Sequence, residues 1–589
     1  MPNYTAPLPE FRFLLGEVFD YERQVTTLPR CGDATLDSVL AVLDHAGVFS
    51  RELLLPINLP GDAQGCWRDA EGVQTPPGYR AAYAAYCRDG WPSLAADPAH
   101  GGQGLPASLA LFVRELVASG SMAFGMYGGL SQGAYRAIAA HGSEALQRLY
   151  LPHLADGSWT GTMCLTEPQA GSDLSRLATR AVPADDGSWR VTGTKIFISG
   201  GDHDLAANIV HLVLARLPDA PPGTRGLSLF VVPKRLPDGA ANGVTCTGIE
   251  HKMGIRASAT AALGFEGARG WLVGEPHGGL RAMFTMMNAS RLGVAVQSVG
   301  VAELSLQNAR AYAFERLQGR APDSTAGTGE QDAIVQHPDV RRNLLMMKAL
   351  VEGCRALYVD GAIALDIRAR ADDPDRRAQA EARLAFLTPV LKAFISDSAV
   401  RVTQLGMTIF GGHGYVHDNG MEQLLRDAAI VPLYEGTNGI QALDLLHRKL
   451  VADEGRAAEA FLADVRQTAG EASGRPALQP LAMQLRQAAE HCAAAGALLR
   501  EQAAVDAATA AAGASDYLRL VGLLACGQAW LRMAIGAEEA AGEEAPAFYA
   551  GKLRTARFYM THLLPEAALL SATIRDGAEI VAQSEPAEL

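Results

Sequence analysis

The sequence predicts a mainly α-helical protein with a small β-domain in its middle. Long stretches with helical periodicity cover residues 36–156 and 278–450. Between them, over residues 160–275, short runs of β-branched and aromatic residues alternate with Gly, Pro and Asp, as is typical of strands joined by turns. After residue 452 the chain is rich in Ala and Leu, which favours further helices.

The chain has 589 residues, which is too long for one ordinary hydrophobic core. At roughly 100 to 200 residues per domain, several units are expected. The changes in composition and periodicity along the chain predict five parts: an N-terminal extension (1–35), an N-terminal helical domain (36–157), a middle β-domain (158–276), a helical bundle (277–450) and an additional helical domain (451–589).

Composition excludes several classes of protein. The formal net charge of -13 argues against a nucleic-acid-binding protein, because such proteins need a basic surface. No run of about 18 apolar residues and no signal-like N-terminus stands out, so we expect a cytoplasmic protein without membrane insertion. The eight cysteines form no pattern with metal-ligand spacing, which predicts free thiols and no metal.

Individual elements can be predicted in the same way. The expected strands of the β-domain are Trp189–Ile198, Asn208–Ala215, Leu227–Val232, Gly243–Gly248 and Ala259–Phe265. The expected helices of the last domain are Pro480–Ala511, Asp516–Ala541 and Phe548–Arg575. A Gly/Thr/Ala/Asp segment at residues 321–329 indicates a solvated loop inserted in the bundle.

The first motif is LTEPQAGSD at residues 165–173, where the β-domain begins. Pro168 and Gly171 favour a loop, and the loop can offer hydroxyls and backbone N–H groups to a pyrophosphate from Thr166, Gly171 and Ser172. By itself the motif is equally compatible with a structural turn. The second motif, GTKIFISGG at residues 193–201, predicts a strand that ends at a Gly pair.

Two residues of that strand, Phe197 and Ser199, lie two positions apart and therefore share a face. An aromatic residue in a strand is more often part of a core than a platform for a cofactor. Both interpretations stay open on these residues alone.

A third group of motifs resolves the choice: FGGHGY (410–415), LRD (425–427) and LYEGTNGIQ (433–441), preceded by KMGIRAS (252–258). In this order and domain setting, the motifs resemble the acyl-CoA dehydrogenase family. The resemblance covers about residues 36–450 and implies a helical domain, a β-domain and a four-helix bundle. The two ends resemble the long bacterial subgroup, which adds a C-terminal helical domain.

The resemblance implies FAD-dependent α,β-dehydrogenation of an acyl-CoA thioester to the trans-2-enoyl-CoA. Glu435 of the YEGT motif would take the α-proton, and the β-hydrogen would leave as hydride to flavin N5. The Glu435 backbone N–H and a flavin ribityl hydroxyl would hold the thioester oxygen. A second branch of the family has its base directly before an arginine, but that position here is Ser290. The following Arg291 would support Glu435 or the substrate; an ordinary salt bridge is the alternative.

The resemblance also implies which residues hold FAD. They are Leu165, Thr166, Gly171 and Ser172 along the flavin and pyrophosphate, Phe197 and Ser199 against the isoalloxazine, Thr437 at the start of the helix after Glu435, and, toward a neighbouring subunit, Arg316, Gly411 and Gly412. The chain departs from the common pattern at Thr408, at Gly319 and in the insert 321–331, which concerns the adenine contacts.

As partners the resemblance implies an acyl-CoA substrate, an electron-transfer flavoprotein as acceptor and a homodimer or higher homo-oligomer. The substrate would be a fatty acyl-CoA or 3-methylmercaptopropionyl-CoA. Three alternatives share the fold: an acyl-CoA oxidase, a flavin-retaining DNA-binding damage-response protein, and a non-catalytic acyl-CoA-binding protein. The acidic C-terminal part disfavours DNA binding, and the intact Glu435 disfavours the non-catalytic protein.

Overall fold

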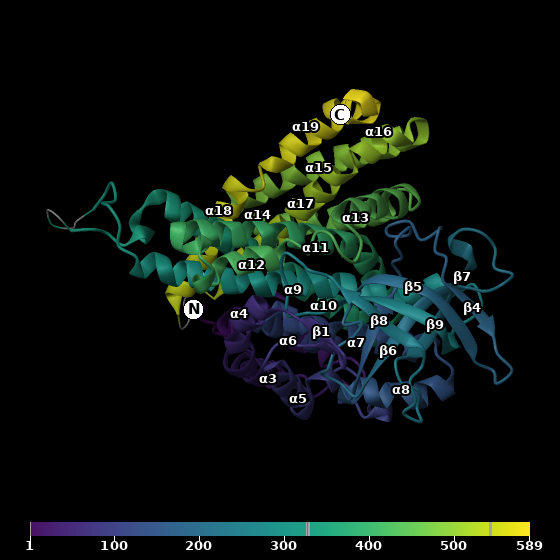
Figure 1. Ribbon diagram of the computed structural model, residues 1–589. Helices are drawn as coiled ribbons and strands as arrows, with labels where there is room; N and C mark the ends of the chain where they lie inside the picture. The colour runs from purple at the N-terminus through teal and green to yellow at the C-terminus, as the bar shows by residue number, and fades with distance from the viewer. Residues whose placement is uncertain (1, 325–326, 328–329, 541–544, 589) are drawn as a thin grey trace. The chain divides into compact units, whose positions relative to one another are not determined.

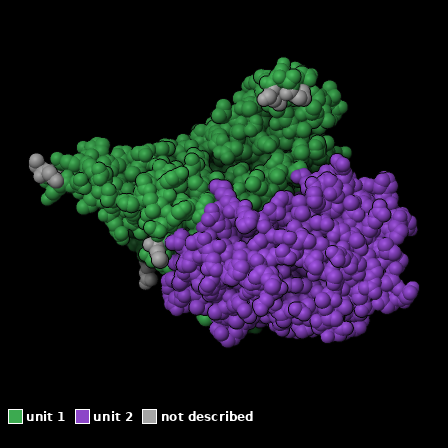
Figure 2. All heavy atoms as spheres, in the orientation of Figure 1, with its two compact units in different colours: residues 1–45, 294–589 green, residues 46–293 purple. Residues whose placement is uncertain are grey.

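The computed structural model describes residues 2–324, 327, 330–540 and 545–588. The chain divides into two compact units (Figure 2). One unit is continuous and comprises residues 46–293. The other combines residues 1–45 with residues 294–589, so that the two ends of the chain belong to the same unit.

The unit 46–293 consists of helices followed by a sheet. Its helices are α4 (Leu55–Gln64), α5 (Tyr79–Arg88), α6 (Ala107–Gly120), α7 (Met122–His141) and α8 (Glu144–Asp156), with α3 (Leu36–Phe49) at the boundary. The seven strands are β3 (Trp159–Cys164), β4 (Arg180–Pro183), β5 (Trp189–Ser199), β6 (Asn208–Arg216), β7 (Leu227–Pro233), β8 (Val244–Ile249) and β9 (Thr260–Val273). They follow the order β3-β6-β4-β5-β9-β7, with β8 beside β9. Strands β4 to β9 are labelled in Figure 1.

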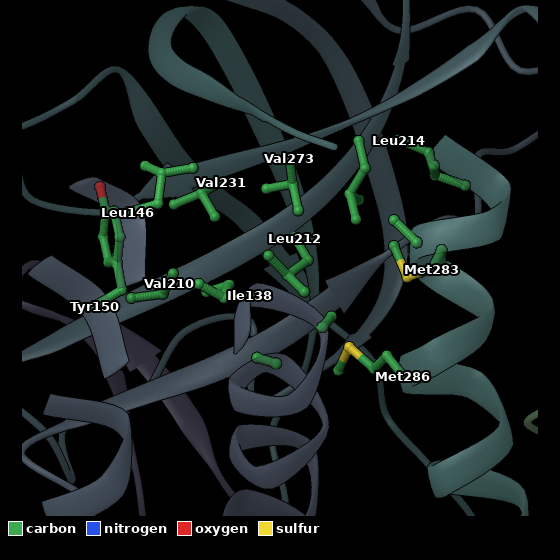
Figure 3. Close-up of a cluster of buried hydrophobic side chains, with 14 of the residues drawn as sticks. Ile138, Leu146, Tyr150, Val210, Leu212, Leu214, Val231, Val273, Met283 and Met286 are labelled. Carbon is green, nitrogen blue, oxygen red and sulfur yellow. The ribbon is translucent and has the colours of Figure 1, made fainter. Parts of the chain in front are cut away.

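Both faces of this sheet are covered, and strand β6 shows why. Successive side chains of a strand point to opposite faces. In β6, Val210, Leu212 and Leu214 join the cluster drawn in Figure 3, together with Met283 and Met286 of helix α9 (Gly279–Glu315). Val213 and Ala215 join the cluster on the other face. Burial on both faces explains why this strand is a continuous apolar run rather than an alternating one.

The other unit is almost entirely helical. Its bundle contains α9 (Gly279–Glu315, from residue 294 on), α10 (Pro338–Arg370), α11 (Pro374–Ile409), α12 (Met421–Ala428) and α13 (Asn438–Asp444). The additional helices are α14 (Arg456–Ser473), α15 (Gln479–Val505), α16 (Ala507–Ala512), α17 (Ala514–Glu539), α18 (Pro546–His562) and α19 (Glu566–Gln583). Helix α17 is long and apolar enough to cross a membrane, but 89% of its most apolar window is buried, as in the core helix of a folded domain.

A buried ionic cluster joins the N-terminal extension to the last helices. The extension forms α1 (Leu8–Arg12) and α2 (Tyr21–Val25). Lys552 of α18 is fully buried, donates to Glu10 of α1 and lies 2.9 Å from Glu352 of α10. Its ammonium is also 5.0 Å from the ring centre of Phe548. Glu352 also pairs with Lys348 of α10, so two lysines balance the two carboxylates. Through Lys552 the extension is part of the core of this unit.

The structure confirms the mainly helical fold with a small β-domain, and all five predicted strands are present. Two of the expected helices are each divided in the structure. The prediction of one helix over Pro480–Ala511 is wrong, because α15 ends at Val505 and Asp506, in extended conformation, caps α16. The prediction of one helix over Phe548–Arg575 is wrong, because α18 ends at His562 and α19 begins at Glu566. Pro565 lies between α18 and α19 and cannot donate the backbone hydrogen bond that a continuous helix needs. The short strands β3 and β4, and a hairpin of β1 (Trp67–Asp69) with β2 (Gly72–Gln74), were not predicted. Of the predicted loop 321–329, residues 325–326 and 328–329 lie outside the described residues.

Candidate active site

The LTEPQAGSD segment follows strand β3 and is fixed by strand β5. The backbone N–H of Ile196 donates to the Thr166 carbonyl at 2.9 Å, and Lys195 Nζ donates to the Leu165 carbonyl at 3.0 Å. Glu167 and Ala170 exchange two backbone hydrogen bonds and close a tight turn. The two motifs of the β-domain therefore form one structure.

Glu167 holds the inside of that turn. Its buried carboxylate lies 2.8 Å from Lys195 Nζ and accepts hydrogen bonds from the backbone N–H groups of Ala178 and Thr179 at 2.7 and 3.0 Å. Burial alone would raise the pKa of Glu167, but Lys195 and the other donors outweigh burial and lower it. Burial lowers the pKa of Lys195 to about 8, although Glu167 opposes this shift.

This ion pair supports the candidate site and was not predicted from the sequence. Both residues lie inside the two motifs, but neither received a role there. A glutamate and a lysine in apolar, strand-forming surroundings are the signal that could have revealed the pair, because buried charges are almost always paired.

The predicted cofactor residues of the loop are accessible. Leu165 and Thr166 are half-buried, whereas Gly171 and Ser172 are exposed. A Cβ atom added at Gly171 would meet no other atom within 4 Å, so the backbone there is open to close approach. The loop thus presents backbone and hydroxyl groups while Glu167 and Lys195 hold it from inside.

Phe197 has an unusual conformation for a residue in a strand. The pairing of β5 with β9 is irregular between Lys195 and Ile198, and Phe197 has a φ of 59°. Phe197 is 59% exposed, while Ser199, two positions on, is half-buried. A positive φ in a bulky residue is strained and occurs mostly at functional sites. The bulge re-aims the aromatic side chain away from the core, which excludes the core interpretation of Phe197.

Arg291 and Ser290 lie on the part of α9 that belongs to the unit 46–293. Both are buried, with exposures of 5% and 6%. A buried arginine is not an ordinary solvated residue, and its assigned role toward Glu435 or substrate stays a prediction.

Glu435 lies in the other unit, on a loop with a strained backbone. Its φ is 57° and that of Gly436 is 86°. Lys392 of α11 donates to the Gly436 carbonyl at 2.8 Å, and Gln441 of α13 donates to the Glu435 carbonyl at 3.2 Å. The side chain of Gln297 on α9 donates to the Tyr434 hydroxyl. Glu435 is half-buried and its carboxylate Oε2 is buried, so neighbouring helices hold this base candidate in a defined place.

Thr437 caps the helix that follows the loop. Its side chain accepts a hydrogen bond from the Ile440 backbone N–H at 3.3 Å, which is the usual contact of an N-cap residue. Asn438 is held by Lys392 at 2.8 Å and by Asp397 at 2.7 Å. The cap and these contacts fix the C-terminal side of the Glu435 loop.

Arg316, Gly411 and Gly412 are exposed in one region of the helical unit. Tyr312, one turn before Arg316 on α9, stacks on Phe410 at 4.1 Å between ring centres, directly before the Gly pair. Gly411 has a φ of 59°, and a Cβ at either glycine would meet no atom within 4 Å. The structure therefore brings the three residues predicted to face a neighbouring subunit to the same surface.

Comparison with protein families accounts for most of the chain. Models of the acyl-CoA dehydrogenase N-terminal, middle and C-terminal domains match residues 64–158, 162–268 and 277–450. A model described as acetyl-CoA dehydrogenase C-terminal like matches residues 461–585. The long C-terminal addition thus has counterparts in other proteins.

Individual relatives agree with these matches. A 3-methylmercaptopropionyl-CoA dehydrogenase of Ruegeria pomeroyi is 43% identical over 98% of both chains. A broad-specificity linear acyl-CoA dehydrogenase of Mycobacterium tuberculosis is 35% identical over 85% of both. The fold is shared with a Bacillus anthracis acyl-CoA dehydrogenase complexed with FAD, at a TM-score of 0.76, 19% identity and coverage of 96% of this chain and 91% of that one. The chain therefore belongs to the acyl-CoA dehydrogenase family of oxidoreductases.

Proposed function

We propose that this enzyme oxidises an acyl-CoA thioester to the trans-2-enoyl-CoA, with Glu435 as the catalytic base. The observation that carries the proposal is the conformation of the Glu435 loop. A non-glycine residue with a φ of 57° costs free energy, and here Lys392 and Gln441 hold the backbone in place. Such a cost is expected where the position of a carboxylate matters for chemistry.

Each protein group has a role that follows from its chemistry. The α-proton of a thioester is weakly acidic, so a base must be held close to it and the enolate oxygen must receive hydrogen bonds. Glu435 takes the proton, and its own backbone N–H is a candidate donor to the thioester oxygen. Lys392 donates a hydrogen bond to the Gly436 carbonyl and so fixes the peptide that follows the base.

The cofactor is FAD, which supplies the hydride acceptor for the β-hydrogen when bound. The residues of the β-domain fit such a group. Phe197 offers an exposed aromatic face to a flat ring, and the loop 165–173 offers accessible backbone and hydroxyl groups, including Thr166 and Ser172. Leu165, Gly171 and Ser199 complete the set that we propose in this unit.

The substrate is a fatty acyl-CoA or 3-methylmercaptopropionyl-CoA, supported by the two relatives named above. We further propose an electron-transfer flavoprotein as acceptor and a homodimer as the assembly. The region around Arg316 and the Gly411–Gly412 pair supports the dimer, because Tyr415, Phe314 and Leu317 there are 80%, 59% and 52% exposed. Large apolar residues gathered on one surface favour burial against another chain.

The first experiment is anaerobic bleaching of the protein-bound flavin with a panel of acyl-CoA thioesters. We expect rapid bleaching by at least one thioester in the wild type. In Glu435→Gln the rate should fall by about 10²- to 10⁴-fold, which is the range for loss of a general base, with FAD still bound.

A matched control is Glu454→Gln. Glu454 is also a glutamate with a positive φ, 56°, but it is exposed and lies after the bundle. It should bleach like the wild type. Loss of bleaching in both variants would point to a general effect of the substitution on the unit, and an undiminished rate in Glu435→Gln would contradict the proposed base. A wild type that binds FAD but bleaches with no thioester would contradict the function.

A further inference from the structure

Helix α17 of the additional domain lies against the two helices that hold the Glu435 loop. It contacts α11, which supplies Lys392, and α13, which begins at Asn438 directly after the loop. The additional domain supplies none of the residues that we assign to the base or to FAD. One of its helices is nevertheless part of the packing around the candidate base.

At Gly522, helices α17 and α11 lie too close together for a side chain. A Cβ at Gly522 would lie 2.5 Å from Cδ2, 2.6 Å from Cγ and 2.8 Å from Cβ of Phe394 on α11. These atoms belong to the root of a buried side chain, which cannot swing aside as the end of a long chain can. Glycine is also the less stable choice inside a helix, so its presence in α17 fits a need for close contact.

Phe394 stands among the residues of α11 that hold the Glu435 loop. Lys392, two positions earlier, donates to the Gly436 carbonyl at 2.8 Å. Ser396, two positions later, accepts a hydrogen bond from the side-chain amide of Asn438 at 3.0 Å. A shift of this short part of α11 therefore moves the supports on both sides of the peptide that follows the base.

Helix α17 is also held on its other sides, so it cannot readily move away from α11. The buried Tyr559 of α18 donates to the Leu523 carbonyl at 2.9 Å. The buried Trp530 of α17 donates to the Ala349 carbonyl of α10 at 2.9 Å. Because packed interiors transmit strain, bulk added at Gly522 displaces the α11 segment rather than α17.

We propose that Gly522 is a positioning residue for the catalytic base. Through Phe394 it sets the place of the α11 segment that holds the peptide after Glu435. This inference rests on the proposed function. Carbon atoms in contact lie about 3.5–4.0 Å apart, so an alanine at this position needs about 1 Å more room. The additional domain thus takes part in catalysis without touching substrate or cofactor.

The test is stopped-flow flavin reduction of the FAD-loaded full chain by the most active thioester, with Gly522→Ala. We expect the limiting rate to fall by about tenfold or more, because misplacement of a reacting group by about 1 Å can cost about 100-fold. FAD binding and the thioester concentration that gives half the limiting rate should stay at the wild-type values.

The matched control is Gly527→Ala on the same helix. A Cβ at Gly527 would lie 3.1 Å from Leu485 and 3.2 Å from Leu564, so it crowds the additional domain itself and not α11. This variant should reduce its flavin at the wild-type limiting rate. An equal loss of rate in both variants would overturn the proposal, because any crowding of α17 would then have the same effect.

A second measurement does not depend on activity. Hydrogen exchange followed by mass spectrometry should show faster exchange in the peptide 433–441 for Gly522→Ala and wild-type exchange for Gly527→Ala. If Gly522→Ala does not fold, Phe394→Leu removes the ring from the α11 side and should both lower the limiting rate and speed this exchange.

The outcomes separate the two proposals. A folded Gly522→Ala variant with the wild-type limiting rate, or with a lower rate but unchanged exchange at 433–441, would overturn the positioning role of Gly522. A wild type that binds FAD but is reduced by no thioester would instead overturn the proposed function. The exchange comparison would then still decide whether Gly522 holds the loop in place.

Discussion

The loop that carries Glu435 and the cluster around Lys552 belong to the same unit but stabilise their buried groups in different ways. In the loop the backbone is strained at Glu435, and side chains from α11 and α13 donate to the carbonyls of Gly436 and Glu435. Around Lys552 the charges themselves are buried and neutralise one another. The loop is held by donors from outside, whereas the cluster depends on its own members.

The difference separates function from stability. Strain is tolerated where a side chain must point in one direction, and it makes the loop sensitive to small changes in its supports. A buried ion cluster contributes little net stability when complete, but breaking it is costly because an unpaired charge stays behind. We therefore expect substitutions in the cluster to affect folding and substitutions around the loop to affect catalysis.

The largest effect on stability should come from Lys552→Met. The substitution leaves Glu10 and Glu352 buried without their shared cation, which costs about 3–5 kcal/mol in comparable buried pairs. Urea unfolding measures the loss, and flavin reduction per folded molecule should not change. Adding Glu10→Gln should recover part of the stability. If Lys552→Met alone is as stable as the wild type, the ionic cluster does not hold the N-terminal extension in place.

Lys392→Met should have the largest effect on catalysis among the residues that support the loop. Lys392 is fully buried and donates to the Gly436 carbonyl and to Asn438. Its loss lets the peptide after Glu435 move, and a shift of about 1 Å can cost roughly 100-fold in rate. Stopped-flow flavin reduction measures the rate, with Lys449→Met as the control. Equal rates of flavin reduction in the two variants would show that Lys392 does not position Glu435.

Gly436→Ala should cause a smaller loss. Gly436 has a φ of 86°, and an added Cβ would lie 2.6 Å from the Gln441 amide nitrogen. Left-handed backbone costs a residue with a side chain about 1–2 kcal/mol, so we expect kcat to fall by about tenfold. Gly439→Ala is the control, since its Cβ would meet only Thr437 at an ordinary 3.9 Å. The strain explanation fails if both alanines have the same kcat.

Asp464→Asn should have the smallest effect. The substitution should lower the free energy of unfolding by an amount that depends on pH. Burial alone would raise the pKa of Asp464, but Arg532 and Arg383 outweigh burial and lower it from the ordinary 3.8. A carboxyl with a lowered pKa stabilises the folded state above its ordinary pKa and loses this contribution as pH falls through the lowered value. Near pH 6 the wild type should be more stable by up to about 1 kcal/mol. Urea melts from pH 6 down to about 3 should show the difference shrinking; a constant difference would exclude the ion pairs as its cause.

Much of the fold follows from local patterns that the sequence displays openly. The strands β5 to β9 were predicted because their β-branched runs are bounded by Gly, Pro and Asp, and the long helices because of their length and composition. The strands β3 and β4 were missed because short strands have little pattern of their own. Their pairing with β6 is a tertiary interaction, which local propensity does not contain.

The residues with a chemical role in the candidate site were predictable from the sequence, but the residues that hold them in place were not. Glu435, Phe197 and the Gly411–Gly412 pair stand out in motifs, whereas Lys392 is one basic residue among many in a long helix. Its role depends on α11 passing beside a loop more than forty residues later in the chain, and no local spacing encodes that approach.

The contact between Lys195 and Glu167 has a consequence for assembly. It joins strand β5 to a loop 28 residues earlier in the chain, so the loop can take its shape only after β5 has entered the sheet. Long-range strand pairing is a late and slow event in folding. We therefore expect that FAD loads onto a chain whose sheet is already complete, and that the newly synthesised protein passes through a compact state with no affinity for its cofactor.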